Sequence, residues 1–255
     1  MAPPIEVTES AVTILERLRV RAPRVHCITN SVAQQYTANV LLAAGALPSM
    51  TISPEEIGSF VAGSDVLLVN LGTFDTQRRA AIGAALDAAK IGQKPWVLDP
   101  VFIERAPDRA RFARELLSRN PAVVRLNNAE FGALSGCDPA GDAPERFAQS
   151  HATIIALTGT ADLVTDGARR AKIVNGDPLM ALVTAMGCAG SALVAAALVV
   201  EPDPFVAASA MLTVFGVAGE VAAEDAGGPG SFAGAIIDAL HGLDGATLRR
   251  RARVS

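Results

Sequence analysis

The run Asp65–Leu71 constrains the fold of this chain more than any other feature of its sequence. Between Asp65 and Asn70, apolar residues follow one another without the alternation that marks a half-exposed strand. Such a run is typical of a strand buried on both faces, which occurs mainly in parallel sheets that helices cover on each side. A helical pattern follows over Asp75–Ile91, so the chain passes from a buried strand to a helix. We therefore expect an α/β fold.

The same succession of short apolar runs and helical patterns extends along most of the chain. Further strands are predicted at Val25–Ile28, Pro48–Ile52, Trp96–Leu98, Ala122–Leu126 and Thr153–Leu157, with a hairpin formed by Leu163–Thr165 and Ala171–Val174. Further helices are predicted at Ser10–Arg19, from the capping residues Thr29-Asn30-Ser31 to Gly45, at Asp108–Ser118, and through the last third of the chain.

Strands that alternate with helices predict a mostly parallel central sheet with helices on both faces. No internal repeat or linker divides residues 1–255, so we expect a single domain. The basic segment 246–255 is expected to be a short solvated tail.

Charge, cysteine usage and apolar run lengths exclude several classes of partner. The formal net charge is −4 and the pI is near 5.4, whereas binding to a nucleic-acid backbone needs a basic surface. Cys27, Cys137 and Cys188 are far apart and form no CxxC pair, which favours free thiols in the cytoplasm. The runs Ala189–Val200 and Phe205–Gly219 are each shorter than the roughly 18 residues of a membrane span, so we expect buried helices.

Polar or small residues follow most of the predicted strands. In parallel sheets, ligands bind beyond the carboxyl ends of the strands, which lie at one edge of the sheet. The residues expected at this edge are Asn30, Asn70, Asp99, Asn127, Glu130, Thr158 and Gly159.

Some of these residues could bind a metal ion and phosphate. Asp99, Asn127 and Glu130 carry the oxygen ligands that Mg²⁺ prefers, and Asn-x-x-Glu spacing places the last two on one face of a helical turn. The structural alternative is that Asn127 and Glu130 form a capping box. Arg125, in an otherwise apolar strand, could contact a phosphate with two N–H groups or form a structural salt bridge.

The segment Asp177–Ser191 runs from a polar turn into an apolar helix. Gly187 stands near the start of that helix, where free N–H groups and the helix dipole favour a phosphate or a developing oxyanion. Cys188 stands at the same point, where the pKa of a thiol tends to be lowered. A buried cysteine that packs at the start of a helix is the alternative. The sequence has no zinc-ligand spacing, Walker A motif or GxGxxG motif.

These motifs occur in an order that resembles one family. They are His26-Cys27-Ile28-Thr29-Asn30, Pro48-Ser49-Met50, Asn70-Leu71-Gly72-Thr73, Asp99-Pro100-Val101, Asn127-x-x-Glu130, Thr158-Gly159, Asp166-Gly167, and Gly176–Met180 leading to Gly187-Cys188. Over about residues 10–242 the chain resembles the hydroxyethylthiazole kinase family of the ribokinase-like superfamily.

The resemblance implies phosphorylation of the hydroxyl of 4-methyl-5-(2-hydroxyethyl)thiazole by ATP with Mg²⁺, in a homotrimer of the thiamine pathway. It implies roles for ten residues: Asn30, Met50 and Ala185 at the substrate, Arg125, Thr158 and Asn127 at ATP, Asp99 and Glu130 at magnesium, and Gly187 and Cys188 in catalysis.

The chain departs from the family pattern near the expected site. Ala185-Met186 replaces a Gly-Thr pair, Phe102–Ala106 replaces a glycine-rich segment, and Leu126 replaces a glycine. These changes motivate two further hypotheses. The protein could be a kinase for another small heteroaromatic alcohol, or a catalytically weakened member that binds the ligand.

Overall fold

The computed structural model describes residues 4–255, and its strands form one eight-stranded sheet. The strands are β1 (Arg24–Ile28), β2 (Leu47–Ser49), β3 (Val66–Asn70), β4 (Trp96–Asp99), β5 (Val123–Asn127), β6 (Ile154–Thr158), β7 (Asp162–Thr165) and β8 (Arg170–Ile173). Their spatial order is β2-β1-β3-β4-β5-β6-β7-β8. The pairs from β2 to β6 are parallel, and β7 and β8 extend the sheet antiparallel. The predicted mostly parallel sheet is therefore confirmed.

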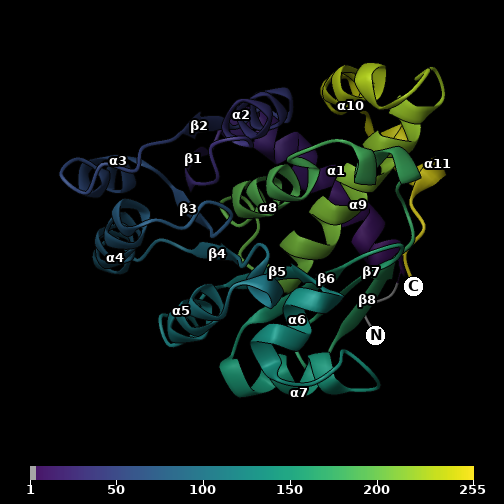
Figure 1. The fold of residues 1–255 in the computed structure, drawn as a ribbon. Helices are drawn as coiled ribbons and strands as arrows, with labels where there is room; N and C mark the ends of the chain where they lie inside the picture. Colours follow the sequence, from purple (N-terminus) through teal and green to yellow (C-terminus); the bar gives the residue numbers. More distant parts are fainter. Residues whose placement is uncertain (1–3) are drawn as a thin grey trace.

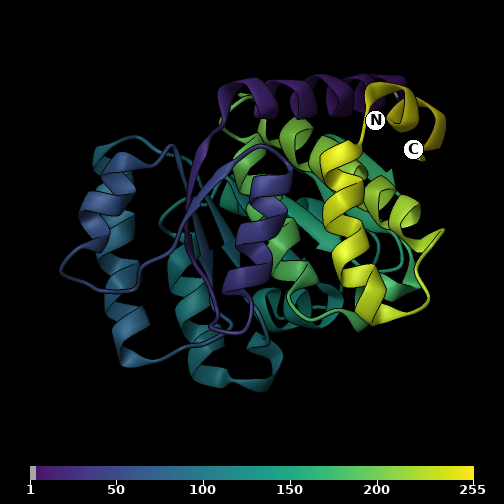
Figure 2. The same cartoon turned by 90° about the horizontal axis from the view of Figure 1, so that it is seen from above.

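Helices cover both faces of this sheet (Figures 1 and 2). One face carries α1 (Pro4–Arg21), α2 (Gln34–Ala43), α8 (Met186–Ala197), α9 (Pro204–Ala223), α10 (Pro229–Gly242) and α11 (Gly245–Arg251). The other carries α3 (Ile57–Gly63), α4 (Thr76–Ile91), α5 (Pro107–Leu117), α6 (Asn128–Ser135) and α7 (Ala143–His151). Two short 3-10 helices, η1 (Ile103–Arg105) and η2 (Pro178–Leu182), lie in the connections.

Strand β3 shows why its sequence is an unbroken apolar run. All of its residues are buried, and successive side chains enter different cores. Val66 and Leu68 belong to the core on the α8 side of the sheet, whereas Leu67 and Val69 belong to the core on the α4 side. Both faces therefore require apolar residues, as the sequence predicted.

Two predicted elements have different limits in the structure. The strand expected at Pro48–Ile52 is the three-residue β2, so Met50 lies beyond its end. The helix expected to open at Thr29-Asn30-Ser31 begins instead at Gln34, and its N-cap Ala33 makes no side-chain hydrogen bond. The side chain of Asn30 has other partners, described below, which explains why it caps no helix.

Helix α9 is longer than the run predicted from the sequence. It extends over 20 residues, which is long and apolar enough to cross a membrane by length and composition alone. However, 83% of its most apolar window is buried inside the protein. The helix packs against α1, α8 and α10 and belongs to the core on that face of the sheet (Figure 1).

Residues 246–255 differ from the solvated tail that their charge suggested. Most of them belong to α11, whose Leu248 is fully buried. Beyond α11, the backbones of Lys172 and Ser255 exchange hydrogen bonds of 2.7 and 2.9 Å at the edge of β8. An unpaired strand edge offers partners to any nearby backbone, and this is not visible in the charge of the segment.

Candidate active site

A cleft of about 590 Å³ lies at the carboxyl ends of the parallel strands. Five of the expected strand-end residues line it: Asn30, Asp99, Asn127, Glu130 and Thr158. The strand order changes direction between β1 and β3, and such a switch point is where open α/β sheets leave room for a ligand. Arg125 of β5 and Ala185, Gly187 and Cys188 at the start of α8 also line the cleft.

Met50 is the one predicted substrate residue that does not line this cleft. It is partly buried and packs against the core on the α1 side of the sheet. The fold therefore brings together nine of the ten residues that the sequence singled out and leaves Met50 apart from them.

Asp99 is almost completely buried and is held by two side chains. Its Oδ2 accepts hydrogen bonds from Asn70 Nδ2 at 2.7 Å and from Ser191 Oγ at 2.8 Å. Burial raises the pKa of Asp99, while Arg125 and the two hydrogen bonds act in the opposite direction. Within residues 4–255, Oδ1 of Asp99 makes no hydrogen bond, so it is the oxygen that remains for a ligand.

Sequence reasoning placed Asn70 at this edge but gave it no role, and it missed Ser191. Asn70 is adjacent to Asp99 because their Cα atoms are paired across β3 and β4. Ser191 lies one helical turn after Gly187, and that i, i+4 spacing is the signal that could have found it.

Asn127 and Glu130 form the capping box of α6. Asn127 Oδ1 accepts from the backbone N–H of Glu130, and Glu130 Oε2 accepts from that of Asn127, both at 2.9 Å. Glu130 Oε1 also accepts from the backbone N–H of Phe102 at 3.0 Å, which joins the loop after β4 to α6. The structural alternative is thus realised, and the same carboxylate lines the cleft. Burial, and secondarily the charge of Asp99, raises the pKa of Glu130 to about 7.

Glu130→Gln is expected to flatten the pH dependence of stability. The pKa of Glu130 is raised from 4.5 to about 7. Between these two pH values, the Glu130 carboxyl keeps its proton in the folded state but has released it in the unfolded chain. The free energy of unfolding therefore falls as pH rises through the window, by about 3 kcal/mol at roughly 1.4 kcal/mol per pKa unit. Urea unfolding of the nucleotide-free proteins across this pH range measures the difference. Parallel curves for the two proteins would contradict the expectation.

Arg125 presents its guanidinium to the start of α8. A methyl group built on Gly187 would lie 3.3 Å from Arg125 Nη1, and one built on Gly190 would lie 3.5 Å from Nε. The two glycines therefore leave the room that the guanidinium occupies. Arg125 Nε is buried and has no hydrogen-bond partner within the described chain. No ion pair of Arg125 occurs within residues 4–255, so the structural salt bridge considered from the sequence is not found there.

Cys188 is buried in the first turn of α8, so the alternative considered from the sequence, a buried cysteine that packs at the start of a helix, is found. It is 8% exposed, and burial, followed by the charge of Asp99, raises its pKa to about 11. Asn30 Nδ2 donates to Cys188 Sγ at 3.2 Å. The helix start tends to lower the pKa of a thiol, but here burial and a nearby carboxylate outweigh that tendency.

Two departures from the family pattern adopt backbone conformations that favour glycine. Ala185 has φ 73° at the N-cap of α8, and Phe102 has φ 56° before η1. Both residues line the cleft. A left-handed residue with a side chain costs on the order of 1–3 kcal/mol, and such residues cluster at functional sites. The chain thus keeps the turn geometry of a glycine while adding side chains to the cleft.

The acidic side chains fit a weakly liganded magnesium ion better than a protein-enclosed metal. Within the part of the chain that the structure describes, no group of three or more His, Cys, Asp or Glu side chains could hold a metal. Mg²⁺ is commonly held by one or two carboxylates together with substrate phosphates and waters. Asp99 Oδ1 is open to such an ion, and Glu130 lies close enough to Asp99 for their charges to interact.

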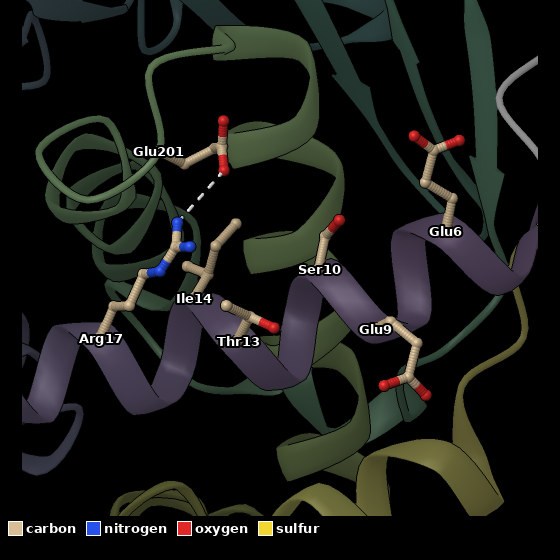
Figure 3. A pocket seen from close by; sticks show the side chains of 7 residues that line it. All are labelled: Glu6, Glu9, Ser10, Thr13, Ile14, Arg17 and Glu201. Atoms are coloured by element: carbon tan, nitrogen blue, oxygen red, sulfur yellow. Dashed lines mark ion pairs between the residues drawn. The ribbon is translucent and has the colours of Figure 1, made fainter.

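A second hollow of about 560 Å³ lies along α1, next to Glu201 in the connection between α8 and α9 (Figure 3). It is lined by Glu6, Glu9, Arg17 and Glu201 among others, and Arg17 pairs with Glu201 at 3.8 Å. None of its lining residues is a strand-end residue. The cleft above the sheet is therefore the candidate active site.

Comparisons with known proteins identify the family of this chain. The sequence model of the hydroxyethylthiazole kinase family matches residues 15–245. A hydroxyethylthiazole kinase from Rhizobium etli is 45% identical over 256 residues, which cover 95% of this chain and 99% of that protein. The solved structure of a hydroxyethylthiazole kinase from Pyrococcus horikoshii has a TM-score of 0.93 and 36% identity, covering 97% of this chain and 98% of that one.

A more distant structure extends the likeness in fold alone. A ribokinase-like superfamily protein from Enterococcus faecalis is 15% identical, with a TM-score of 0.63 over 89% of this chain and 93% of that one. The predicted ribokinase-like architecture is thus confirmed. Since the family model spans most of the chain and a relative covering 95% of it is 45% identical, this protein belongs to the hydroxyethylthiazole kinase family.

Proposed function

We propose that this protein transfers the γ-phosphoryl group of ATP to the hydroxyl of 4-methyl-5-(2-hydroxyethyl)thiazole, with Mg²⁺, in thiamine biosynthesis or salvage. Family membership supports the reaction class. The observation that carries the proposal is the cleft itself, where Arg125, two carboxylates and the first turn of α8 converge at one edge of the sheet.

The proposed division of roles follows the family resemblance, and the shared cleft supports it. Arg125, Thr158 and Asn127, which come from β5 and β6, face the nucleotide. The backbone N–H groups of Gly187 and Cys188, in the first turn of α8, hold the oxygens of the transferred phosphoryl group.

The remaining cleft residues serve the metal and the alcohol. Asp99 and Glu130 organise Mg²⁺, which neutralises phosphate charge when bound. Asn30 and Ala185 contact the alcohol.

The reaction needs alignment more than a strong base. Phosphoryl transfer proceeds through a loose transition state, so positioning and charge neutralisation supply most of the rate. The hydroxyl oxygen bonds to the γ-phosphorus as the bond to the β–γ bridging oxygen breaks, and the hydroxyl proton leaves to a phosphoryl oxygen. A thiol with a pKa near 11 suits this mechanism because it keeps its proton and orients the alcohol.

The other candidate functions rest on the residues that depart from the family pattern. Phe102, Ala185 and Met186 all line the cleft, where they could reshape the alcohol pocket for another heteroaromatic alcohol or weaken turnover. The deciding experiment measures ATP-dependent phosphorylation of the thiazole alcohol and of hydroxymethylpyrimidine, with and without Mg²⁺. Preference for the pyrimidine overturns the proposed substrate. Binding of the thiazole alcohol without any product identifies a catalytically weakened member.

Replacing Cys188 should separate positioning from proton abstraction. We expect Cys188→Ala to lower kcat by on the order of tenfold with little change in KM, because a positioned hydrogen-bonding group is lost. In the wild type, kcat should show no ionisation at the ordinary thiol pKa of 9.0, since the thiol stays protonated until about pH 11. The pH profiles of both proteins provide the check. If kcat of the wild type changed with an apparent pKa near 9.0, and this change were absent in Cys188→Ala, the thiol would be identified as the base.

We further propose that the protein is a cytoplasmic homotrimer. Family membership supports both statements. Light scattering after size-exclusion chromatography tests the assembly, and a mass of one chain of 26.3 kDa would overturn it.

A further inference from the structure

We infer that Asn70 is a positioning residue that fixes which atom of the Asn30 side chain faces the substrate hydroxyl. The inference deepens the proposed function, on which it rests, by assigning the hydrogen-bond polarity of the alcohol pocket. The structural basis is a chain of buried side chains that leads from Asp99 through Asn70 to Asn30 and Cys188.

The orientation of the Asn70 amide is set by two partners that each allow only one role. The Asp99 carboxylate only accepts, so the amide nitrogen of Asn70 must face it, at 2.7 Å. The backbone N–H of Gly72 only donates, and it reaches Asn70 Oδ1 at 3.0 Å. Asn70 is 1% exposed, so water does not compete for these contacts. If the Asn70 amide were flipped, its oxygen would face the Asp99 carboxylate and its NH₂ group would face the Gly72 N–H.

The orientation of Asn70 then determines that of Asn30. Because Asn70 Oδ1 is an acceptor, the amide nitrogen of Asn30 faces Asn70 Oδ1, at 3.5 Å. The same nitrogen donates to Cys188 Sγ at 3.2 Å. Gly72 leaves room for this arrangement, since a methyl group on Gly72 would lie 2.7 Å from both Asn30 Cβ and Nδ2. Because the Cys188 thiol can donate or accept, Asn70 Oδ1 is the partner that fixes the orientation of the Asn30 amide.

One polar atom of this network remains without a partner. Asn30 Oδ1 is buried and makes no hydrogen bond with any group in residues 4–255, although Asn30 lines the cleft and is only 8% exposed. A buried amide oxygen is costly to leave unpaired, so a ligand that donates a hydrogen bond to it is favoured at this position. An alcohol hydroxyl is such a ligand, because it can donate to Asn30 Oδ1 and accept from the neighbouring thiol. The ligand class selected at this corner is thus a hydroxyl, rather than an ether or an alkyl group.

Binding experiments test this assignment. Calorimetry gives the ratio of the Kd of 4-methyl-5-ethylthiazole, which lacks the hydroxyl, to that of 4-methyl-5-(2-hydroxyethyl)thiazole. We expect the alcohol to bind wild type more tightly by on the order of tenfold. In Asn70→Leu the ratio should fall toward one, since Asn30 can then turn its nitrogen to the cleft. General damage to the pocket would weaken both ligands equally and leave the ratio unchanged.

A double variant tests polarity directly. In Asn70→Asp with Asp99→Asn, the carboxylate and the amide exchange places, so the residue at position 70 still accepts from Gly72 N–H and from Asn30 Nδ2. We expect this protein to keep the wild-type ratio while losing phosphoryl transfer, because the carboxylate has left position 99. If Asn70→Leu fails to fold, the double variant still tests the inference. A ratio near one in the folded double variant would overturn the inference.

A matched control lies outside the cleft. Asn175 Nδ2 donates to Glu220 Oε1 at 2.9 Å, which is another asparagine–carboxylate hydrogen bond, so Asn175→Leu should lower stability without changing the ratio. An unchanged ratio in folded Asn70→Leu, or no preference for the alcohol in the wild type, also overturns the inference. Phosphorylation of the thiazole alcohol by the wild type is measured in parallel, so that failure of the proposed function is recognised separately.

Discussion

Asp99→Asn is expected to lower kcat by on the order of 10³ while the protein remains folded. Asp99 combines near-complete burial with an oxygen, Oδ1, that no side chain of residues 4–255 engages, while Asn70 and Ser191 hold its other oxygen. The substitution removes the negative charge that would organise magnesium beside the phosphates. It keeps the shape of the side chain and an oxygen that can face Asn70.

The stability of Asp99→Asn should change much less than its activity. Burial raises the pKa of Asp99, which means that the folded state disfavours the charge, and the asparagine relieves that cost while weakening two hydrogen bonds. We expect a change in the free energy of unfolding of about 1 kcal/mol or less. Steady-state kinetics and urea unfolding measure the two effects. Asp138→Asn, at an exposed carboxylate, is the control and should match the wild type. A kcat within threefold of the wild type would exclude a role for the Asp99 charge.

Arg125→Met should lower kcat/KM for ATP by on the order of 10³. Among the described residues that line the cleft, Arg125 is the one cationic side chain, and its buried Nε has no hydrogen-bond partner within residues 4–255. A phosphate would supply that partner and make the charge-assisted hydrogen bonds that a guanidinium forms best. The methionine keeps much of the side-chain volume beside Gly187 and Gly190 but carries neither charge nor donors.

A lysine variant separates charge from geometry. Arg125→Lys keeps the charge but cannot form two parallel hydrogen bonds, so we expect its activity to lie between those of Arg125→Met and the wild type. Arg146→Met, at an exposed ion pair on α7, is the control. If Arg125→Met and Arg146→Met have the same kcat/KM for ATP, the guanidinium does not contact the nucleotide.

The sequence predicted most of the fold because the fold depends on short-range patterns. The unbroken apolar run at β3 and the helical pattern after it are local consequences of burial on both faces of a sheet. Since the carboxyl ends of parallel strands lie at one edge of the sheet, the polar residues that follow the strands can be grouped from the sequence alone. This is how Asn30, Asp99, Glu130 and Thr158 were selected together, and the cleft contains all four.

The predictions that failed, and the alternatives that the sequence left open, depended on groups far apart in the sequence. The sequence left open whether the helix start lowers the pKa of the Cys188 thiol or the thiol is simply buried, and burial and the charge of Asp99, which comes from another strand, raise that pKa. Asn30 was expected to cap a helix, but it donates to Cys188, a residue 158 positions later. The local sequence shows where a helix begins and which residue could cap it. It does not show which distant residues contact that side chain in the folded protein.

The sequence by itself determined the strand-helix alternation, the edge of the sheet where the polar residues gather, and the family resemblance. Only the tertiary structure decided the protonation of Cys188, the hydrogen-bond network from Asp99 to Asn30, and the separation of Met50 from the cleft. The physical reason is that periodicity and caps act within a few residues, whereas burial, electrostatic fields and hydrogen-bond partners are set by whichever strands and helices the fold brings into contact.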